Sequence, residues 1–270
     1  MASIGFIPHP LPTTPLTTSQ EDKVAFIREE TGIQDSEALK QHIITVQKKA
    51  YAVKSFPCIR YFAFAWERIS ELPAYKEVLK LGRERDNAIL LDIGCCYFWD
   101  VGHELFRSTP ESFPVAFLPG NAVDPAFLKP LPPLGTASQI TESPPSLSSL
   151  MTLTPLHGHI SAIHVSSVFH LLFEAEQTQL AHSLAELLSP LPGSLIFGYH
   201  IARETVGLGP VDRNQTDGRR VFCHSPESWV ALWEGIFGVK RVKVDVELTK
   251  VVISDDDVER SWLTWSVTRV

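Results

Sequence analysis

Residues 88–96, AILLDIGCC, have the types and spacing of a ligand-binding turn. Four apolar residues lead into Asp92 and then Gly94, the pattern of a strand that is buried on both faces and ends in a tight turn. Gly94 lets the backbone of such a turn approach a ligand closely, whereas Cys95 is merely small. The match to a glycine-rich nucleotide loop is partial. A nucleotide site and an ordinary buried strand followed by a turn therefore both fit these residues.

Other reactive residues form no recognised catalytic or metal-binding pattern. His157, His159 and His164 lie close together in sequence, but no carboxylate or cysteine stands at ligand spacing from them, so we expect no metal site. The chain has no Gly-x-Ser-x-Gly elbow and no Walker loop, which argues against hydrolases and kinases. Its four cysteines show no CxxC or zinc-finger spacing, and this usage predicts a reducing, cytoplasmic compartment.

Composition limits the class of partner. The 270 residues are 44% hydrophobic, enough for one sizeable core, and the formal net charge is -7. Because Lys and Arg form no long cluster, we expect neither nucleic acid nor a membrane surface as a partner. A small molecule fits better. No stretch reaches the length of a membrane span, and the Pro-rich residues 1–17 predict a flexible arm.

The elements before the turn are helical. Apolar residues at spacings of three and four after Asp35 predict one amphipathic helix, and a further helix is expected from Pro57 until Pro73 stops it. With a shorter helix on either side of this pair, residues 18–83 are predicted to form a helical N-terminal cap.

Residues 84–270 alternate between strand and helix patterns and predict one α/β domain. Its last two strands are expected to form an antiparallel hairpin, and the rest of the sheet to be mainly parallel. Ser225, followed by Pro226, predicts the start of a helix. The expected elements are strands at 88–91, 114–118, 160–165 and 194–200, helices at 99–106 and 174–188, irregular chain at 130–157 and a loop at 202–220.

Three motifs, taken in order, resemble a known family. LDIGCC at 91–96, SSVFHLL at 166–172 and HSPESWVALW at 224–233 are similar to motifs of fungal class I methyltransferases associated with terpenoid and meroterpenoid pathways. The resemblance spans roughly residues 35 to 250. It implies a Rossmann-like sheet, S-adenosylmethionine as cofactor, and methyl transfer to a hydroxyl or carboxyl of a small apolar secondary metabolite.

The chain departs from the family pattern just after LDIGCC. In the family a loop, a helix and a second strand follow, and an acidic residue at the end of that strand binds the ribose. Here a segment similar to the next family motif begins at Trp99, so one βα unit is expected to be missing. Glu111 lies near the spacing of a ribose-binding acid but precedes the expected strand. A ribose role and a solvated loop carboxylate both stay open. Loss of a covering helix would expose an apolar flank and favour a homo-oligomer.

The resemblance also implies roles for individual residues. Methyl transfer needs alignment, plus a base when the acceptor is a hydroxyl, and the two histidines in the motifs could equally be structural. Asn121 stands where the family has an Asp that reads the adenine amino group, and an amide oxygen can accept the same hydrogen bond. The expected roles are catalysis for His170 and His224, cofactor binding for Asp92, Gly94, Cys95, Asn121 and Ser166, and substrate binding for Phe169, Trp229 and Trp233.

Two functions from different classes follow. The first is a working methyltransferase with a shortened cofactor domain, and the second is a catalytically silent relative that serves as a binding or interaction protein. A nicotinamide-dependent oxidoreductase would fit the strand at 88–91, but the chain lacks a complete GxGxxG.

Overall fold

The computed structural model describes residues 21–60, 62–65, 69–95, 98–140, 142–211, 220–253 and 258–270. The flexible arm expected at 1–17 lies outside these ranges. Contacts divide the chain into two compact units. The helical unit holds the described residues up to 65 and Cys95–Phe117, and the sheet unit holds Ile69–Gly94, Leu118–Val211 and Arg220–Val270. This grouping differs from the division at residues 83 and 84 that the sequence suggested.

The helical unit is built on two main helices that precede the sheet in sequence. Helix α1 spans Glu21–Thr31, and α2 spans Ser36–Val53. The backbone N–H of Ala38 donates to the Asp35 carboxylate at 2.8 Å, which caps α2. Short helix α3 (Pro57–Arg60) and helix α5 (Trp99–Phe106) complete the unit. Its buried apolar side chains come from all of these helices and the turns between them: Val24, Ile27, Leu39, Ile43, Val46, Phe62 and Leu105.

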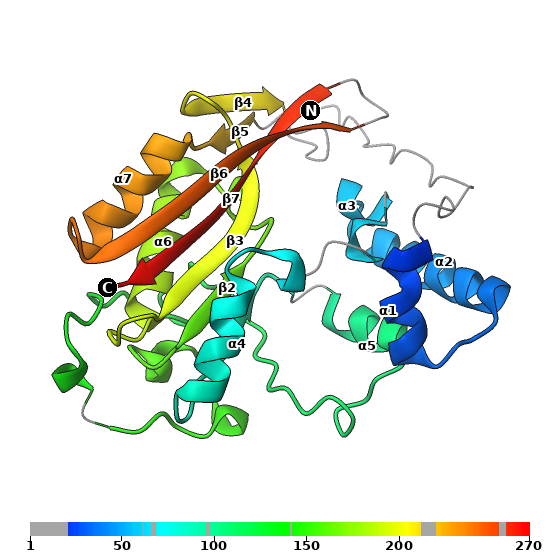
Figure 1. The fold of residues 1–270 in the computed structure, drawn as a ribbon, viewed down its shortest axis with the longest axis horizontal. Coiled ribbons are helices and arrows are strands. Elements are labelled where there is room, and N and C mark those ends of the chain that lie inside the picture. Colours follow the sequence, from blue (N-terminus) through cyan, green and yellow to red (C-terminus); the bar gives the residue numbers. More distant parts are fainter. Residues whose placement is uncertain are drawn as a thin grey trace, which may run out of the picture. The chain divides into compact units, whose positions relative to one another are not determined.

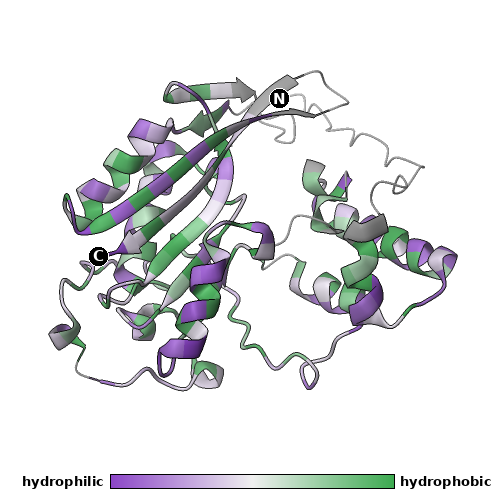
Figure 2. Ribbon diagram, viewed as in Figure 1, coloured by the Kyte–Doolittle hydropathy of each residue, from purple (hydrophilic) through white to green (hydrophobic). Residues whose placement is uncertain are grey.

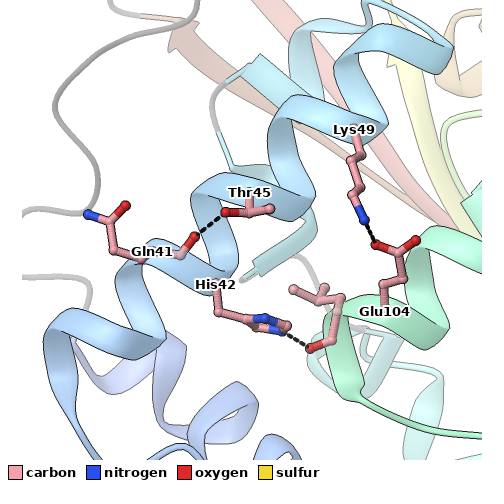
Figure 3. Close-up of polar contacts among 6 residues, drawn as sticks. Gln41, His42, Thr45, Lys49 and Glu104 are labelled. Atoms are coloured by element: carbon pink, nitrogen blue, oxygen red, sulfur yellow. Dashed lines mark hydrogen bonds and ion pairs between the residues drawn. The ribbon is translucent and has the colours of Figure 1, made fainter.

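Polar contacts join α2 to α5 within this unit (Figure 3). His42 Nε2 lies 2.8 Å from the Leu105 carbonyl oxygen, and because a carbonyl can only accept, Nε2 carries the proton. About two turns further along α2, Lys49 pairs with Glu104. Both side chains of that pair are about half exposed, so the pair adds little stability, and the apolar core holds the helices together.

The expected long helix from Pro57 to Pro73 is wrong. Helix α3 ends at Arg60, and Phe62 then takes a left-handed φ of 58°. A non-glycine residue in this region cannot continue a right-handed helix, and the buried Phe62 ring packs in the core of the helical unit. Only short 3₁₀ turns follow among the described residues, at Ala63–Ala65 and Ile69–Glu71.

The sheet unit contains a five-stranded mixed sheet in the order β1-β2-β3-β7-β6 (Figure 1). The α/β fold and the C-terminal antiparallel hairpin are confirmed. The sheet is not mainly parallel, because β1-β2-β3 pair in parallel and β3-β7-β6 pair antiparallel. The strands are β1 (Leu90–Ile93), β2 (Ala162–Val165), β3 (Leu195–Ala202), β6 (Val242–Ile253) and β7 (Val258–Arg269).

Strand β1 lies at the edge of this sheet and is less buried than expected. The sequence predicted a strand covered on both faces, yet Leu90 is 48% exposed and Leu91 is only half-buried. The strand expected at 114–118 is also wrong. Phe117 instead stacks on Trp99 of α5, with ring centroids 4.5 Å apart. The described residues between β1 and Asn121 contain no strand, so the sheet ends at β1.

Helices cover both faces of the sheet (Figure 1). On one face, Val78 of α4 (Tyr75–Glu84) packs with Ala162, Leu195 and Phe197. On the other face lie α6 (Glu174–Leu187) and α7 (Pro226–Phe237), whose apolar residues share the main core with β2, β3 and β7. Ser225 caps α7, as expected, by accepting from the Ser228 N–H at 3.2 Å. Figure 2 shows β6 alternating between polar and apolar residues, as a strand covered on one face does.

The loop expected at 202–220 holds one strand, and a second strand begins at its last residue. β4 (Gly207–Val211) and β5 (Arg220–Cys223) form a separate antiparallel pair. The Arg220 guanidinium donates to the Gly209 carbonyl at 2.8 Å and to the Leu208 carbonyl at 3.2 Å. Gly207 and Gly209 thus lie in a short antiparallel ladder, and the Arg220 guanidinium adds two hydrogen bonds to it.

The irregular chain at 130–157 has, in its described part, only short 3₁₀ turns, as expected. Two backbone groups of this segment form hydrogen bonds with side chains elsewhere in the sheet unit. The buried Glu186 carboxylate of α6 accepts from the Leu131 N–H, and the Arg269 guanidinium donates to the Leu134 carbonyl. Burial raises the pKa of Glu186 to about 7, so this anchor is partly protonated near neutral pH.

We predict that Gly198→Ala strongly destabilises the sheet unit. A Cβ at Gly198 of β3 would lie 2.0 Å from the Val165 carbonyl oxygen, a backbone atom of the neighbouring strand. Overpacking of this kind costs about 1–3 kcal/mol of unfolding free energy, which urea denaturation measures.

Gly235→Ala in α7 is the matched control, because no atom lies within 4 Å of its added Cβ. It is expected to raise the unfolding free energy by about 0.5–1 kcal/mol through helix propensity. Equal stability of the two variants would contradict the close approach of β2 and β3.

Candidate functional site

The carboxyl ends of β1 and β2 bring three of the predicted cofactor residues together, Asp92, Gly94 and Ser166. Asp92 and His164 are direct partners in the parallel register, so their side chains lie on the same face of the sheet. Gly94 lies two residues after Asp92, and Ser166 lies two residues after His164. Ligands of open α/β sheets bind at this edge, which makes it the candidate site.

A chain of hydrogen bonds joins three of these side chains. His164 Nδ1 lies 2.7 Å from Asp92 Oδ1, and His164 Nε2 lies 2.7 Å from Ser166 Oγ. Because a carboxylate can only accept, Nδ1 donates to Asp92, and Nε2 shares a hydrogen bond with the Ser166 hydroxyl. We call this the Asp92–His164–Ser166 chain. Its carboxylate end is open, with the Asp92 side chain 56% exposed and that of His164 only 14% exposed.

The sequence analysis did not identify His164 as a site residue, because it considered His164 only together with His157 and His159 as metal ligands and expected no metal site. Within the described residues, no group of three or more His, Cys, Asp or Glu could hold a metal ion. His157 instead lies with Nε2 2.9 Å from the Pro132 carbonyl oxygen. The feature of the sequence that could have identified His164 is its position near the end of an expected strand, β2, which pairs with the strand that carries Asp92.

The turn after β1 requires glycine. Gly94 has φ +113°, and a Cβ there would lie 2.6 Å from Cγ2 of Val168, in the loop after β2. Ser167 in the same loop is left-handed, with φ 57°, and its N–H donates to the Tyr199 carbonyl at 2.8 Å. The turn and the loop are therefore packed against each other at the candidate site. Cys95, the residue after the glycine, is half-buried.

The two histidines expected to be catalytic have different surroundings. His170 is half-buried, and its Nδ1 lies 3.5 Å from the Ile201 backbone nitrogen. His224 is only 7% exposed, with Nδ1 2.9 Å from Ser228 Oγ, and burial lowers its pKa to about 4. His224 is thus a neutral acceptor at pH 7, but the surrounding protein covers it. Their roles as bases stay predictions.

A third histidine, His200 of β3, lies between these two. It is fully buried, and its Nδ1 accepts from Trp265 Nε1 at 2.9 Å. Burial lowers its pKa well below the ordinary value, with His170 and His224 adding to the effect. No sequence motif singled out His200. His170 and His224, the two histidines predicted from the motifs, are therefore both close enough to His200 to lower its pKa.

The residues expected to bind substrate lie in the core. Phe169, Trp229 and Trp233 each have 0% exposure. The Trp229 ring lies 4.9 Å from that of Phe169 and 5.7 Å from that of Trp233. These rings fill the space between α7 and the sheet, so contact with a substrate would need a change of packing. Their substrate role stays a prediction.

Asn121 and Glu111 lie in exposed turns. Asn121 belongs to the sheet unit, and its Oδ1 accepts from the Val123 N–H at 3.2 Å. Glu111 belongs to the helical unit, where hydrogen bonds from the Thr109 side chain and from its own backbone lower its pKa. Neither contact involves the Asp92–His164–Ser166 chain, and the roles of both residues toward a cofactor stay predictions.

Comparisons with known proteins show which proteins this chain is similar to. Residues 13–65 match a meroterpenoid methyltransferase N-terminal domain. Methyltransferase ausD of Penicillium brasilianum is 26% identical over 254 residues, covering 90% of this chain and 86% of its own length. O-methyltransferase phiE of a fungal species (strain ATCC 74256) is 29% identical, covering 74% and 66%. Asnovolin E/Chermesin D methyltransferase nvfJ of Aspergillus novofumigatus is 24% identical, covering 87% and 84%.

The chain is a relative of the fungal meroterpenoid methyltransferases. The domain match ends at residue 65, within the helical unit, so it covers helices α1, α2 and α3. The described residues contain no helix long and apolar enough to cross a membrane.

We predict that His224→Leu reduces the acid sensitivity of this methyltransferase relative. The folded-state pKa of about 4 lies below the ordinary 6.5, so the unfolded chain takes up a proton first as the pH falls. The stability that neutral His224 contributes is complete above about pH 6.5 and is lost as the pH falls toward 4. From pH 7 to 5 the wild type should lose about 1–2 kcal/mol more unfolding free energy than the variant, measured by urea denaturation at both pH values.

His182→Leu on α6 is the matched control, because His182 is exposed and its removal leaves the buried histidines in place. If His224→Leu kept the full loss on acidification, the buried neutral state of His224 would be wrong.

Proposed function

We propose that this protein transfers a methyl group from S-adenosylmethionine to an oxygen of a small apolar secondary metabolite. The observation that carries the proposal is the carboxyl edge of β1 and β2, where Gly94 forms a close turn beside the Asp92–His164–Ser166 chain. The names of the relatives support methyl transfer, and the name of O-methyltransferase phiE supports an oxygen acceptor.

The residues at this edge suit one end of the cofactor. Asp92 and Ser166 present acceptor oxygens, and Gly94 leaves room for a close approach, which fits the positively charged amino-acid end. Cys95 would line the same turn. Asn121 is proposed to read the adenine, although its Oδ1 already accepts from Val123. When bound, the cofactor supplies an electrophilic methyl group on a sulfonium.

The ribose has a poorer site. Strand β1 is the edge of the sheet, so no neighbouring strand in the described residues ends in an acid beside it. Glu111 is fully exposed in a turn of the helical unit. We propose that loss of this partner weakens cofactor binding and impairs the enzyme.

The acceptor's chemistry decides whether a base is needed. A carboxylate acceptor is already deprotonated, whereas a hydroxyl must lose its proton during transfer. His170 and His224 are the proposed bases for a hydroxyl, and His224 is suited by its neutral state but not by its burial. Phe169, Trp229 and Trp233 are proposed to form the apolar wall that the substrate meets after repacking.

A catalytically silent binding protein is the second candidate function. The absence of a described acidic strand end beside β1 favours it, because the ribose would lose its charged acceptor. Isothermal titration with S-adenosylmethionine separates the two candidates, since heat of binding with turnover supports the enzyme and an absence of binding supports the silent relative.

We predict that Gly94→Val abolishes binding of S-adenosylmethionine. Its φ of +113° strains any β-branched residue, and an added Cβ would lie 2.6 Å from Val168 Cγ2, so the turn that is proposed to contact the ligand would have to shift. Titration calorimetry measures the affinity, and thermal melting shows whether the variant is folded. Cys95→Leu places bulk in the same turn at a position without positive φ, and Gly82→Ala in α4, with no atom within 4 Å of its Cβ, is the control. Unchanged affinity in the two turn variants would refute the site.

We predict a dissociation constant for S-adenosylmethionine in the high micromolar range or above. A ligand hydroxyl that loses a charged acceptor forfeits about 1.5–3 kcal/mol, or roughly one to two decades of affinity. Insertion of a family-like loop, helix and acid-terminated strand between Phe98 and Trp99 should restore binding. A low-micromolar constant in the unaltered chain would show that another residue holds the ribose and that the enzyme is not impaired in this way.

A further inference from the structure

Residues 129–134, KPLPPL, are a proline-rich segment of the sheet unit, and we call them the proline strap. Pro130, Pro132 and Pro133 lack a backbone N–H and have a fixed φ. The segment belongs to no helix or strand. A backbone of this kind cannot hold itself in place through a regular ladder of hydrogen bonds, so other parts of the sheet unit must fix it.

Three side chains hold the proline strap in place. The carboxyl group of Glu186, in the last turn of α6, accepts from the Leu131 N–H through Oε2. The Arg269 guanidinium of β7 donates to the Leu134 carbonyl, and His157 Nε2 lies 2.9 Å from a carbonyl oxygen of the strap. Because arginine keeps its charge at every pH that a folded protein meets, only the glutamate and histidine contacts of these three can change with pH.

The proline strap packs against residues 153–158, the segment that returns toward β2. A Cβ at Gly158 would lie 2.3 Å from Leu134 Cδ1, which shows how closely the two segments approach. The Gly158 N–H also donates to the backbone carbonyl of Glu186 at 2.9 Å. Glu186 therefore binds the strap through its side chain and the returning segment through its backbone.

Glu186 is poorly placed to carry a charge. Its exposure is 1%, and its second carboxyl oxygen, Oε1, is buried without a hydrogen-bond partner in the part of the chain that the structure describes. Burial raises the pKa of Glu186 to about 7, and the hydrogen bond from the Leu131 N–H offsets only part of that effect. The closed strap thus favours the neutral carboxylic acid over the carboxylate.

Neighbouring charges do not set the protonation of Glu186. Burial and the Leu131 N–H are the two causes of its pKa shift, and no charged group among the described residues adds to them. The charged and titratable side chains on the surrounding segments are Lys129, His157 and His159 before β2, His182 on α6, Glu234 on α7 and Arg269 on β7.

The direction of the pH effect follows from the two states of the strap. If the strap opens, water reaches the Glu186 carboxyl and its pKa returns to the ordinary 4.5. Between pH 4.5 and 7 the closed state therefore holds a proton that the open state releases. The preference for the closed state is complete below about pH 4.5 and is lost as the pH rises through about 7.

We propose that the proline strap is a pH-sensitive latch, held closed by the neutral Glu186 carboxyl and loosened when that carboxyl ionises. The strap lies in the connection from the Asn121 turn to β2, the strand that carries His164. Its release would therefore loosen the chain between two parts of the candidate site. The latch does not depend on methyl transfer.

Hydrogen exchange followed by NMR tests the latch in the full-length protein. The opening constant of the Leu131 amide, which is its exchange rate divided by the intrinsic rate at the same pH, should rise about tenfold from pH 6 to pH 8. The Leu180 amide in the middle of α6 should have a much smaller opening constant at both pH values, because the strap opens locally. Glu186→Gln keeps a hydrogen-bond acceptor but cannot ionise, so the rise at Leu131 should disappear.

Glu174→Gln, at an exposed position of the same helix, is the matched control and should keep the tenfold rise. His157→Gln should keep it as well, because the latch is assigned to the glutamate. Glu186→Met supplies a second uncharged variant if Glu186→Gln does not fold. The latch would be overturned by an absence of the rise in the wild type, by the same rise in the uncharged variant, by loss of the rise in His157→Gln, or by equal opening constants at Leu131 and Leu180.

Discussion

Parallel pairing between β1 and β2 is the constraint on which the candidate site depends. The two strands share four paired positions, and this register alone sets Asp92 opposite His164. A slip of one residue would turn the carboxylate to the other face of the sheet. The register is held from the β2 side, because Ile163 and Val165 have no exposed surface and are fixed in the main core. A buried strand thus positions the side chains of an exposed one.

Elements specified by local signals could be predicted from the sequence. Ser225 and Pro226 start α7 through capping and a preset φ, and the alternation from Val242 to Leu248 identifies a strand covered on one face. Elements that depend on distant partners were missed. The segment at 114–118 has the composition of a strand, but Phe117 finds its partner in Trp99 instead of a neighbouring strand. β4 needs β5 as its partner, and Gly207 and Gly209 within β4 gave that segment the composition of a loop.

The same division applies to the site. Asp92, Gly94 and Ser166 could be brought together from the sequence, because the carboxyl ends of neighbouring parallel strands meet at one edge. His164 could not, since its role depends on the exact pairing of the strands. Phe169 and Trp229 show a second limit. An aromatic side chain that lines a pocket and one that fills a core have the same sequence pattern, and only the structure shows that these two have no exposed surface.

The edge position of β1 also affects how a ligand would be held. This strand has four residues and pairs with one neighbour in the described sheet, so little holds it closed. Segments with few buried contacts open at a lower free energy than the global fold, and their amide hydrogens exchange sooner. We therefore expect β1, which carries Asp92, to unfold locally at a lower free energy than the inner strands of the sheet. Part of the binding energy of a ligand that contacts this carboxylate would therefore go into keeping β1 paired with β2.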